Sequence, residues 1–374
     1  MDRYAERISR ARALMRDAGL DFLLVGPSAD LYYLIGAQSR PSERLALLAL
    51  SASGPGFMVL PAFEAPTLPP MPADVQVLTW QEDQDPAALL AGNIATACGS
   101  GQSHARCVIG VSDRVWSVFL LRLQAALPWA KFTTAGQVLA EMRQVKSPEE
   151  IELLRWSGEA ADRVFDEIIT RRFSGRSELH VAQELADLLR QAGLRVEGLP
   201  IVASGPNSAS PHHHAGERII QHGDAVVLDF GGTYEGYYSD ITRTVFVGQA
   251  PEWGSNAHRV YEAVAQAQEA AVTAARPGMT CEALDRVARD LLTNAGYGQY
   301  FTHRLGHGIG LDGHEPPYLV QGNPTPLRAG MTFSIEPGVY IPGLFGVRIE
   351  DIVALHDDGA ERLNNATRDI VVVR

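Results

Sequence analysis

The sequence predicts an α/β protein of two domains, in which the larger C-terminal domain consists of two similar halves. The chain has 374 residues, which is long for a single domain. Residues 1–135 alternate between predicted helices and strands, and residues 174–194 align without a gap to residues 277–297. We therefore expect an N-terminal domain over 1–135, a linker over 136–147 and a second domain over 148–374.

The N-terminal region has the pattern of a sheet with helices packed on it. Helices are expected over 5–18, ended by Gly19, and over 116–127, ended near Pro128. The proline-rich stretch 62–75 is expected to be a surface loop. Apolar runs predict four buried strands, at 20–26, 44–52, 56–62 and 106–112.

The second region begins with a strong helix signal. Ser147 is a capping residue, and Pro148 and two glutamates follow it in the first turn, so a helix should run to about Arg172. Both copies of the repeat are capped helices ended by glycine, and each follows a long helical stretch, the second at 256–275. Chance similarity would not repeat the order of the flanking elements, so we expect two α-β halves about a pseudo-twofold axis with a site between them.

Composition narrows the classes of partner. A net charge of −12 argues against nucleic acid or an anionic membrane, and no apolar run has the ~20 residues of a membrane span. Residues 1–15 resemble an amphipathic helix and lack the apolar core of a signal peptide, so a cytoplasmic protein is expected. Cys98, Cys107 and Cys281 have unrelated spacings, which predicts three free thiols.

Three histidines lie in the stretch HRLGHGIGLDGHE, at positions 303, 307 and 314. His303 and His307 have the spacing of a zinc-protease helix, but Arg304 stands where that motif has glutamate. The alternating glycines also disfavour a helix, so strand or loop backbone is expected. Any metal bound here needs further ligands from elsewhere in the chain.

Four carboxylates interrupt apolar strand-like runs. Asp229 and Asp240 belong to the first half, and Glu336 and Glu350 belong to the second. Burying unpaired carboxylates is costly, and four that converge would repel one another unless a cation lay among them. Four carboxylates and an imidazole suit two Mn²⁺ or Co²⁺ ions better than a thiolate zinc site, and a two-metal site suits hydrolysis of an amide or a related bond.

These residues carry a resemblance to the pita-bread metallopeptidases, which include prolidases, aminopeptidase P and methionine aminopeptidase. The resemblance is strongest over residues 200–352, and the N-terminal domain is similar to that of prolidase and aminopeptidase P. It implies a pita-bread catalytic domain preceded by a creatinase/prolidase-type domain. The segments that carry it are ASGPNSASPH, LDFGG with SDITRT, GHGIG with HE, SIEPG and VRIED.

The resemblance implies a role for each matched residue. Asp229 would chelate one metal, Asp240 and Glu350 would bridge both, and His307 and Glu336 would hold the other. Mn²⁺ is the expected ion, with Co²⁺ or Zn²⁺ as alternatives. A metal-bridging hydroxide would then attack the bond before proline, with Glu336 also moving the proton.

The same resemblance assigns residues around the substrate. His314 would stabilise the oxyanion, His303 would line the proline pocket, and His212 would bind substrate, although His213 and His214 follow it directly. Arg348 would support the metal carboxylates.

The preferred length of the substrate stays open. We favour a Xaa-Pro dipeptidase, and the alternative is an aminopeptidase P, which accepts longer peptides. The loop 36–44 is our candidate for a length gate in a homodimer. Arg40 or Arg44 would bind a substrate carboxylate and Glu43 an amino terminus, or these charges are simply solvated or paired within their domain. A non-catalytic binding protein and a metal-free amidinohydrolase of the creatinase type are the remaining alternatives, and the complete ligand set argues against both.

Overall fold

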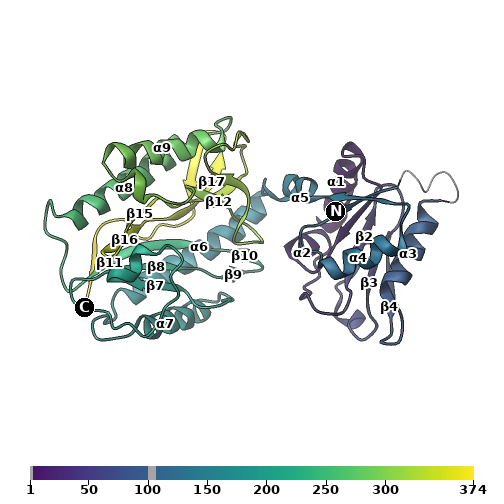
Figure 1. Ribbon diagram of the computed structural model, residues 1–374, viewed down its shortest axis with the longest axis horizontal. Coiled ribbons are helices and arrows are strands. Elements are labelled where there is room, and N and C mark those ends of the chain that lie inside the picture. The colour runs from purple at the N-terminus through teal and green to yellow at the C-terminus, as the bar shows by residue number, and fades with distance from the viewer. Residues whose placement is uncertain (1–2, 100–106) are drawn as a thin grey trace. The chain divides into compact units, whose positions relative to one another are not determined.

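The computed structural model describes residues 3–99 and 107–374, which divide into two compact units, 1–143 and 144–374 (Figure 1). The division lies inside the stretch that was expected to be a linker. Residues 136–143 of that stretch form a helix whose buried side chains are Val138, Leu139 and Met142, and this helix belongs to the first unit.

The first unit is built on a six-stranded mixed sheet in the order β4-β3-β2-β1-β5-β6. The strands are β1 (Phe22–Val25), β2 (Leu47–Ser51), β3 (Gly56–Pro61), β4 (Val75–Trp80), β5 (Val108–Val111) and β6 (Lys131–Thr134). The helices are α1 (Arg3–Asp17), α2 (Ala29–Ile35), α3 (Pro86–Ala97), α4 (Ser117–Ala126) and α5 (Gly136–Arg143), with a short 3₁₀ turn at Ala65–Thr67.

The two predicted helices and four predicted strands of this unit are confirmed, and α2, α3, α5, β4 and β6 were not predicted. β4 and β6 are edge strands with several exposed positions, so they lack the apolar runs that marked the others. α3 is rich in alanine and apolar on most of its surface, so it has little amphipathic periodicity.

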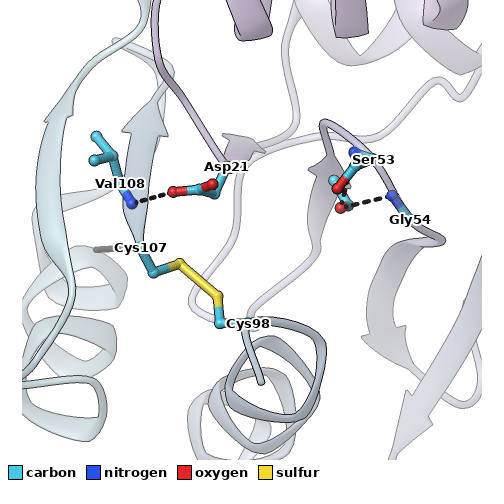
Figure 2. Close-up of a disulfide and its surroundings, with 7 residues drawn as sticks. Asp21, Ser53, Gly54, Cys98, Cys107 and Val108 are labelled. Carbon is cyan, nitrogen blue, oxygen red and sulfur yellow. Dashed lines mark hydrogen bonds between the residues drawn. A yellow bond between two sulfur atoms is a disulfide. The ribbon is translucent and has the colours of Figure 1, made fainter. Parts of the chain in front are cut away.

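Two of the cysteines form a disulfide, so the prediction of three free thiols is wrong for them. Cys98 directly follows α3, and Cys107 directly precedes β5 (Figure 2). These two elements bring the Cα atoms within 6.4 Å. Cys281 is a buried free thiol, as predicted, and burial raises its pKa to about 11.

The second unit contains the two predicted halves. The first half has α6 (Pro148–Ile168), α7 (Glu178–Gln191) and a sheet in the order β19-β11-β8-β7. The second has α8 (Asn256–Ala274), α9 (Cys281–Asn294) and a sheet in the order β13-β12-β14-β17-β18. Figure 1 shows α8 and α9 along one side of the strands and α7 on the other.

The strands of this unit, with two short hairpins, complete the architecture. The first sheet contains β7 (Ile201–Ser204), β8 (Ala225–Phe230), β11 (Ile241–Val247) and β19 (Val371–Val373). The second contains β12 (Gly306–Gly308), β13 (Glu315–Leu319), β14 (Thr332–Ile335), β17 (Asp351–His356) and β18 (Gly359–Arg362). The hairpins are β9 (Thr233–Tyr234) with β10 (Tyr237–Tyr238), and β15 (Gly338–Ile341) with β16 (Phe345–Arg348). Two 3₁₀ turns lie at Gly205–Ala209 and Gly298–Tyr300.

The sequence repeat corresponds to a structural repeat. α7 and α9 each have 14 residues, and each is capped at its start by a hydroxyl side chain, Ser177 or Thr280. Each is followed by a glycine with positive φ, 90° at Gly193 and 87° at Gly296, as a helix C-terminus favours. Each half therefore packs a helix pair on its own sheet around its own apolar core.

In the described residues, no helix combines the length and apolar character that crossing a membrane requires.

Candidate active site

The five predicted metal ligands converge where the two halves of the second unit meet. Asp229 lies on β8, and Asp240 directly precedes β11. Strand pairing explains the convergence, because Thr242 pairs with Asp229 on one side and bridges to Glu350 on the other. The strand and loop backbone expected at the histidines is confirmed, since His307 lies on β12.

The ligand atoms lie close enough to share ions. Within each of three groups, all ligand atoms are within 4.8 Å of one another. Glu350 belongs to two of these groups: in one its partners come from the first half of the unit, and in the other they come from the second half. The groups are Asp229 with Asp240 and Glu350, His307 with Glu336 and Glu350, and Asp240 with His307 and His314.

His307 is oriented as a ligand. Its Nδ1 lies 3.1 Å from the carbonyl oxygen of Gly308, which places the proton on Nδ1 and the lone pair on Nε2. Nε2 lies 3.2 Å from Glu336 Oε1 and 3.9 Å from Asp240 Oδ2. Burial lowers the pKa of His307, but the two carboxylates raise it by more. The raised pKa favours a second proton on Nε2, and a cation bound at Nε2 would take the place of that second proton.

The carboxylates themselves favour a bound cation. Burial and the neighbouring carboxylates raise the pKa values of Asp240 and Glu350 well above the ordinary range. Burial also raises the pKa of Glu336, but His307 lowers it by more, to about 2. Four carboxylates and one imidazole around a common point fit two divalent ions with oxygen and nitrogen ligands. The residues present therefore suit a dinuclear metal centre.

Arg348, which the resemblance suggests as a support for the metal carboxylates, contacts this cluster through hydrogen bonds. Its Nη2 donates to Asp229 Oδ2 at 2.7 Å, and its Nε donates to Thr242 Oγ1 at 3.0 Å. Thr242 Oγ1 in turn donates to Glu350 Oε2 at 2.6 Å. One buried guanidinium thus orients a carboxylate from each half, the second through Thr242, which the sequence analysis did not single out.

Tyr340 joins Arg348 to His303. Its hydroxyl accepts from Arg348 Nη1 at 2.7 Å and donates to His303 Nε2 at 2.9 Å. His303 Nδ1 donates to the Arg304 carbonyl oxygen at 2.7 Å, so both ring nitrogens are occupied. Burial lowers the pKa of His303, which keeps the ring neutral. Tyr340, which the sequence analysis missed, therefore sets the orientation of the histidine expected to line the proline pocket.

We expect Tyr340→Phe to reduce kcat/KM of the hydrolysis expected at this site about tenfold, because the buried hydrogen bonds from Arg348 and to His303 are lost together. The metal content should not change, since the ligands remain. Steady-state kinetics with elemental analysis would check this, and Tyr300→Phe, on a partly buried tyrosine whose hydroxyl makes neither of these two hydrogen bonds, is the matched control. Unchanged kinetics would mean that His303 needs no orientation by Tyr340.

His314 is placed to act as a hydrogen-bond donor. Its ring stacks on that of His307 with 3.7 Å between centroids, and Arg304 Nη2 donates to its Nδ1 at 3.1 Å. Burial and the neighbouring His307 lower its pKa to about 4. A neutral ring that accepts at Nδ1 carries its proton on Nε2, which is the form an oxyanion donor needs.

The three adjacent histidines, His212, His213 and His214, have different surroundings. His213 Nε2 contacts the buried Glu178 Oε2 at 2.8 Å. The charge of His212 contributes to lowering the pKa of both His303 and His314, after the larger effect of burial. His212 and His214 are both exposed. Of the three, His212 is the histidine whose charge acts on His303 and His314, whereas His213 is bound to Glu178.

The three candidate gating residues belong to the first unit. Arg44 forms ion pairs with Glu43 and, at 2.7 Å, with Glu82, and its guanidinium lies 5.6 Å from the ring centre of Phe63. Arg40 is exposed. For Arg44 and Glu43, these contacts favour the alternative of charges paired within the domain.

A buried ion pair supports the loop that carries His314. Lys146 Nζ lies 2.6 Å from Glu315 Oε1, and the two side chains are 2% and 5% exposed. Glu315 Oε2 also accepts from the backbone amide of Asp312 at 3.4 Å. The only sequence signal for this pair was the HE dipeptide, and nothing identified Lys146 as its partner.

Comparisons with known proteins agree with this geometry. Residues 152–357 match the model of metallopeptidase family M24, and residues 7–145 match that of the creatinase/prolidase N-terminal domain. The chain is 41% identical to a probable dipeptidase PepE of Mycobacterium tuberculosis, covering 99% of this chain and 96% of that protein. It is 34% identical to a Xaa-Pro dipeptidase of Lactobacillus helveticus, covering 98% of each. The crystal structure of dipeptidase PepE from Mycobacterium ulcerans superposes with a TM-score of 0.91 at 42% identity, covering 100% of this chain and 99% of that one.

Proposed function

This chain belongs to metallopeptidase family M24, and on that premise we propose that it is a Xaa-Pro dipeptidase. The resemblance seen in the sequence and the two-domain pita-bread architecture are both confirmed by the family matches and by the solved relative. The observation that carries the proposal is the complete set of five ligands within the three metal-binding groups. Relatives named as dipeptidases, alike over nearly the whole chain, support the choice of a short substrate.

In the proposed reaction, two divalent ions would be held by Asp229, Asp240, His307, Glu336 and Glu350, and when bound they would supply an activated water. His314 donates from Nε2 to the substrate carbonyl oxygen as negative charge develops there. Glu336, ionised at neutral pH, takes a proton from the attacking water as the new C–O bond forms, and then passes it to the proline nitrogen as the C–N bond breaks. His212 and His303 hold the substrate, and Arg348 keeps Asp229 and Thr242 in place.

Proline makes a dedicated site necessary. The bond before proline has no amide N–H, so a peptidase cannot bind it through that donor. A pocket that recognises the ring and the end groups has to supply the specificity instead. His303, neutral and fixed by Tyr340, suits the wall of such a pocket because its nitrogens are already satisfied.

The decisive experiment compares a Xaa-Pro dipeptide with a Xaa-Pro-Xaa tripeptide, each with added Mn²⁺. Cleavage of the dipeptide alone is the expected result. Cleavage of the tripeptide at a similar rate would make the enzyme an aminopeptidase P, and cleavage of neither by metal-loaded protein would reject the proline specificity.

We keep the loop 36–44 as the proposed length gate, with Arg40 as its principal cation because Arg44 is already paired with Glu82. If Arg40 binds the substrate carboxylate, Arg40→Ala should raise KM for the dipeptide about tenfold or more, since a charge-assisted hydrogen bond is lost. The ratio of tripeptide to dipeptide cleavage should rise. Arg122→Ala, on a half-exposed arginine of the same unit, is the control, and an equal effect of both would reject the gate.

Mn²⁺ is the ion we propose, with Co²⁺ or Zn²⁺ as alternatives, because carboxylate-rich sites accept several divalent ions and availability decides between them. A homodimer and a cytoplasmic location complete the proposal. Sedimentation analysis and cell fractionation test these two points.

A further inference from the structure

One buried carboxylate in the second unit lies outside the metal centre and is not used by the reaction as described. Glu178 is the first residue of α7, and it is 0% exposed. Burying a charge is unfavourable unless its surroundings supply hydrogen bonds. Here the donors come from one segment, residues 204–216, which begins with the last residue of β7 and which we call the 204–216 loop.

Both oxygens of Glu178 are occupied by that loop. Oε1 accepts from the amide and the hydroxyl of Ser204, each at 2.7 Å. The side-chain amide of Asn207 lies 3.1 Å from each oxygen. Oε2 also contacts His213 Nε2 at 2.8 Å and the amide of Gly216 at 3.4 Å. Burial raises the pKa of Glu178, but these hydrogen bonds lower it by more, so the group is ionised at neutral pH.

The same loop is held from the opposite side by the metal centre. Arg348 Nη1 donates to the carbonyl oxygen of Pro211 at 3.3 Å, while Nη2 of the same side chain binds Asp229. His212 therefore lies between two anchored neighbours, Pro211 on the side of the metal ligands and His213 on the side of α7. Of the two exposed histidines beside His213, His212 is the one that directly follows Pro211, whose carbonyl is held by the arginine of the metal centre.

We propose that Glu178 is a positioning residue: its hydrogen bond to His213 fixes the loop backbone and thereby orients the neighbouring His212 toward the substrate. The inference rests on the proposed function, because it gives His212 a substrate to bind. It explains why two adjacent histidines have different roles, one held by a buried carboxylate and one exposed. It also predicts that His213 affects the reaction only through His212.

A double-mutant cycle between His212 and His213 tests this interaction. The four proteins are the wild type, His212→Ala, His213→Ala and the double variant, assayed with a Xaa-Pro dipeptide and Mn²⁺. We expect His213→Ala to reduce kcat/KM about tenfold, mainly by raising KM, because a buried charge-assisted hydrogen bond that fixes the loop is lost. In the His212→Ala background, the same change should have no further effect.

Two further variants separate positioning from general loss of structure. His213→Gln, which keeps an N–H donor of similar reach, should recover most of the activity, and Glu178→Gln should resemble His213→Ala in raising KM. His214→Ala, on the adjacent exposed histidine, should stay within twofold of the wild type. Metal content should be equal in all variants, because none of these residues is a ligand.

The outcomes separate the two proposals. Additive losses in the cycle, or a fall in kcat with KM unchanged, would show that Glu178 and His213 merely stabilise the fold and would overturn the positioning role. A wild-type enzyme that binds metal but cleaves no Xaa-Pro dipeptide would instead reject the proposed function, and the positioning role with it.

Discussion

Glu350→Gln is expected to remove peptidase activity almost completely and to lower the metal content of the purified protein. Glu350 belongs both to the group with Asp229 and Asp240 and to the group with His307 and Glu336, so it is a shared ligand candidate. Changing a residue that only supports a metal ligand costs about 10–100-fold, so changing a shared ligand should cost at least ~100-fold in kcat/KM. Steady-state kinetics and elemental analysis of the same preparation measure both effects.

In the metal-free protein, the same variant should have the opposite effect, an increase in thermal stability. Without ions, the clustered carboxylates repel one another, and burial raises the pKa of Glu350 well above its usual range. Glu350→Gln should therefore raise the melting temperature of the chelated protein and reduce the stabilisation gained when Mn²⁺ is added. Glu361→Gln, on a partly exposed carboxylate paired with Arg155, is the control. A Glu350→Gln variant that keeps two ions and full activity would contradict the assigned role.

Arg348→Met should cause the second large effect, on both stability and catalysis. Arg348 is 3% exposed and contacts Asp229, Thr242 and Tyr340. Removing one partner of a buried ion pair typically costs 3–5 kcal/mol, so the free energy of unfolding of the metal-free protein should fall by about that amount. The loss of orientation at Asp229 and Glu350 should also reduce kcat/KM by about 10–100-fold in the metal-loaded enzyme.

Arg348→Lys tests whether the positive charge at this position is sufficient or whether the directed hydrogen bonds of the guanidinium are needed. Lysine restores the positive charge but cannot make the three directed contacts of the guanidinium, so we expect it to recover stability in part and activity little. Denaturant unfolding of the metal-free protein and kinetics of the loaded enzyme provide the two measurements. Full activity of Arg348→Met would show that the carboxylates need no support from this side chain.

The five side chains that converge as candidate metal ligands could be singled out from the sequence because each stands in a short segment with its own signal. Asp229, Asp240, Glu336 and Glu350 are carboxylates in or beside apolar strands, and His307 lies among glycines. Such local patterns survive without knowledge of the fold. The halves were predictable for the same reason, since α7 and α9 keep a common capping and glycine pattern.

The supporting residues could not be predicted in this way, because their partners are distant along the chain. Thr242 is 108 residues from Glu350, and Tyr340 is identified only by its contacts with Arg348 and His303. Glu178 has the sequence character of an ordinary acidic residue in the first turn of a helix. Its burial, and hence its partners, depend on where the loop 204–216 lies. The Cys98–Cys107 disulfide was missed for a related reason, because it depends on how α3 meets β5.

The buried pair of Lys146 and Glu315 has a practical consequence for anyone who wishes to express the catalytic unit alone. The matched M24 region begins at residue 152, so a shortened gene designed on that limit would omit Lys146 together with Ser147, which caps α6. Glu315 would remain buried next to His314 without its cation, and the protein would be expected to express poorly or to lose activity. A start codon placed ahead of Gln144, where the second unit begins, keeps both residues. A loss of activity in that shorter protein could then be attributed to the missing N-terminal domain and not to the loss of Lys146.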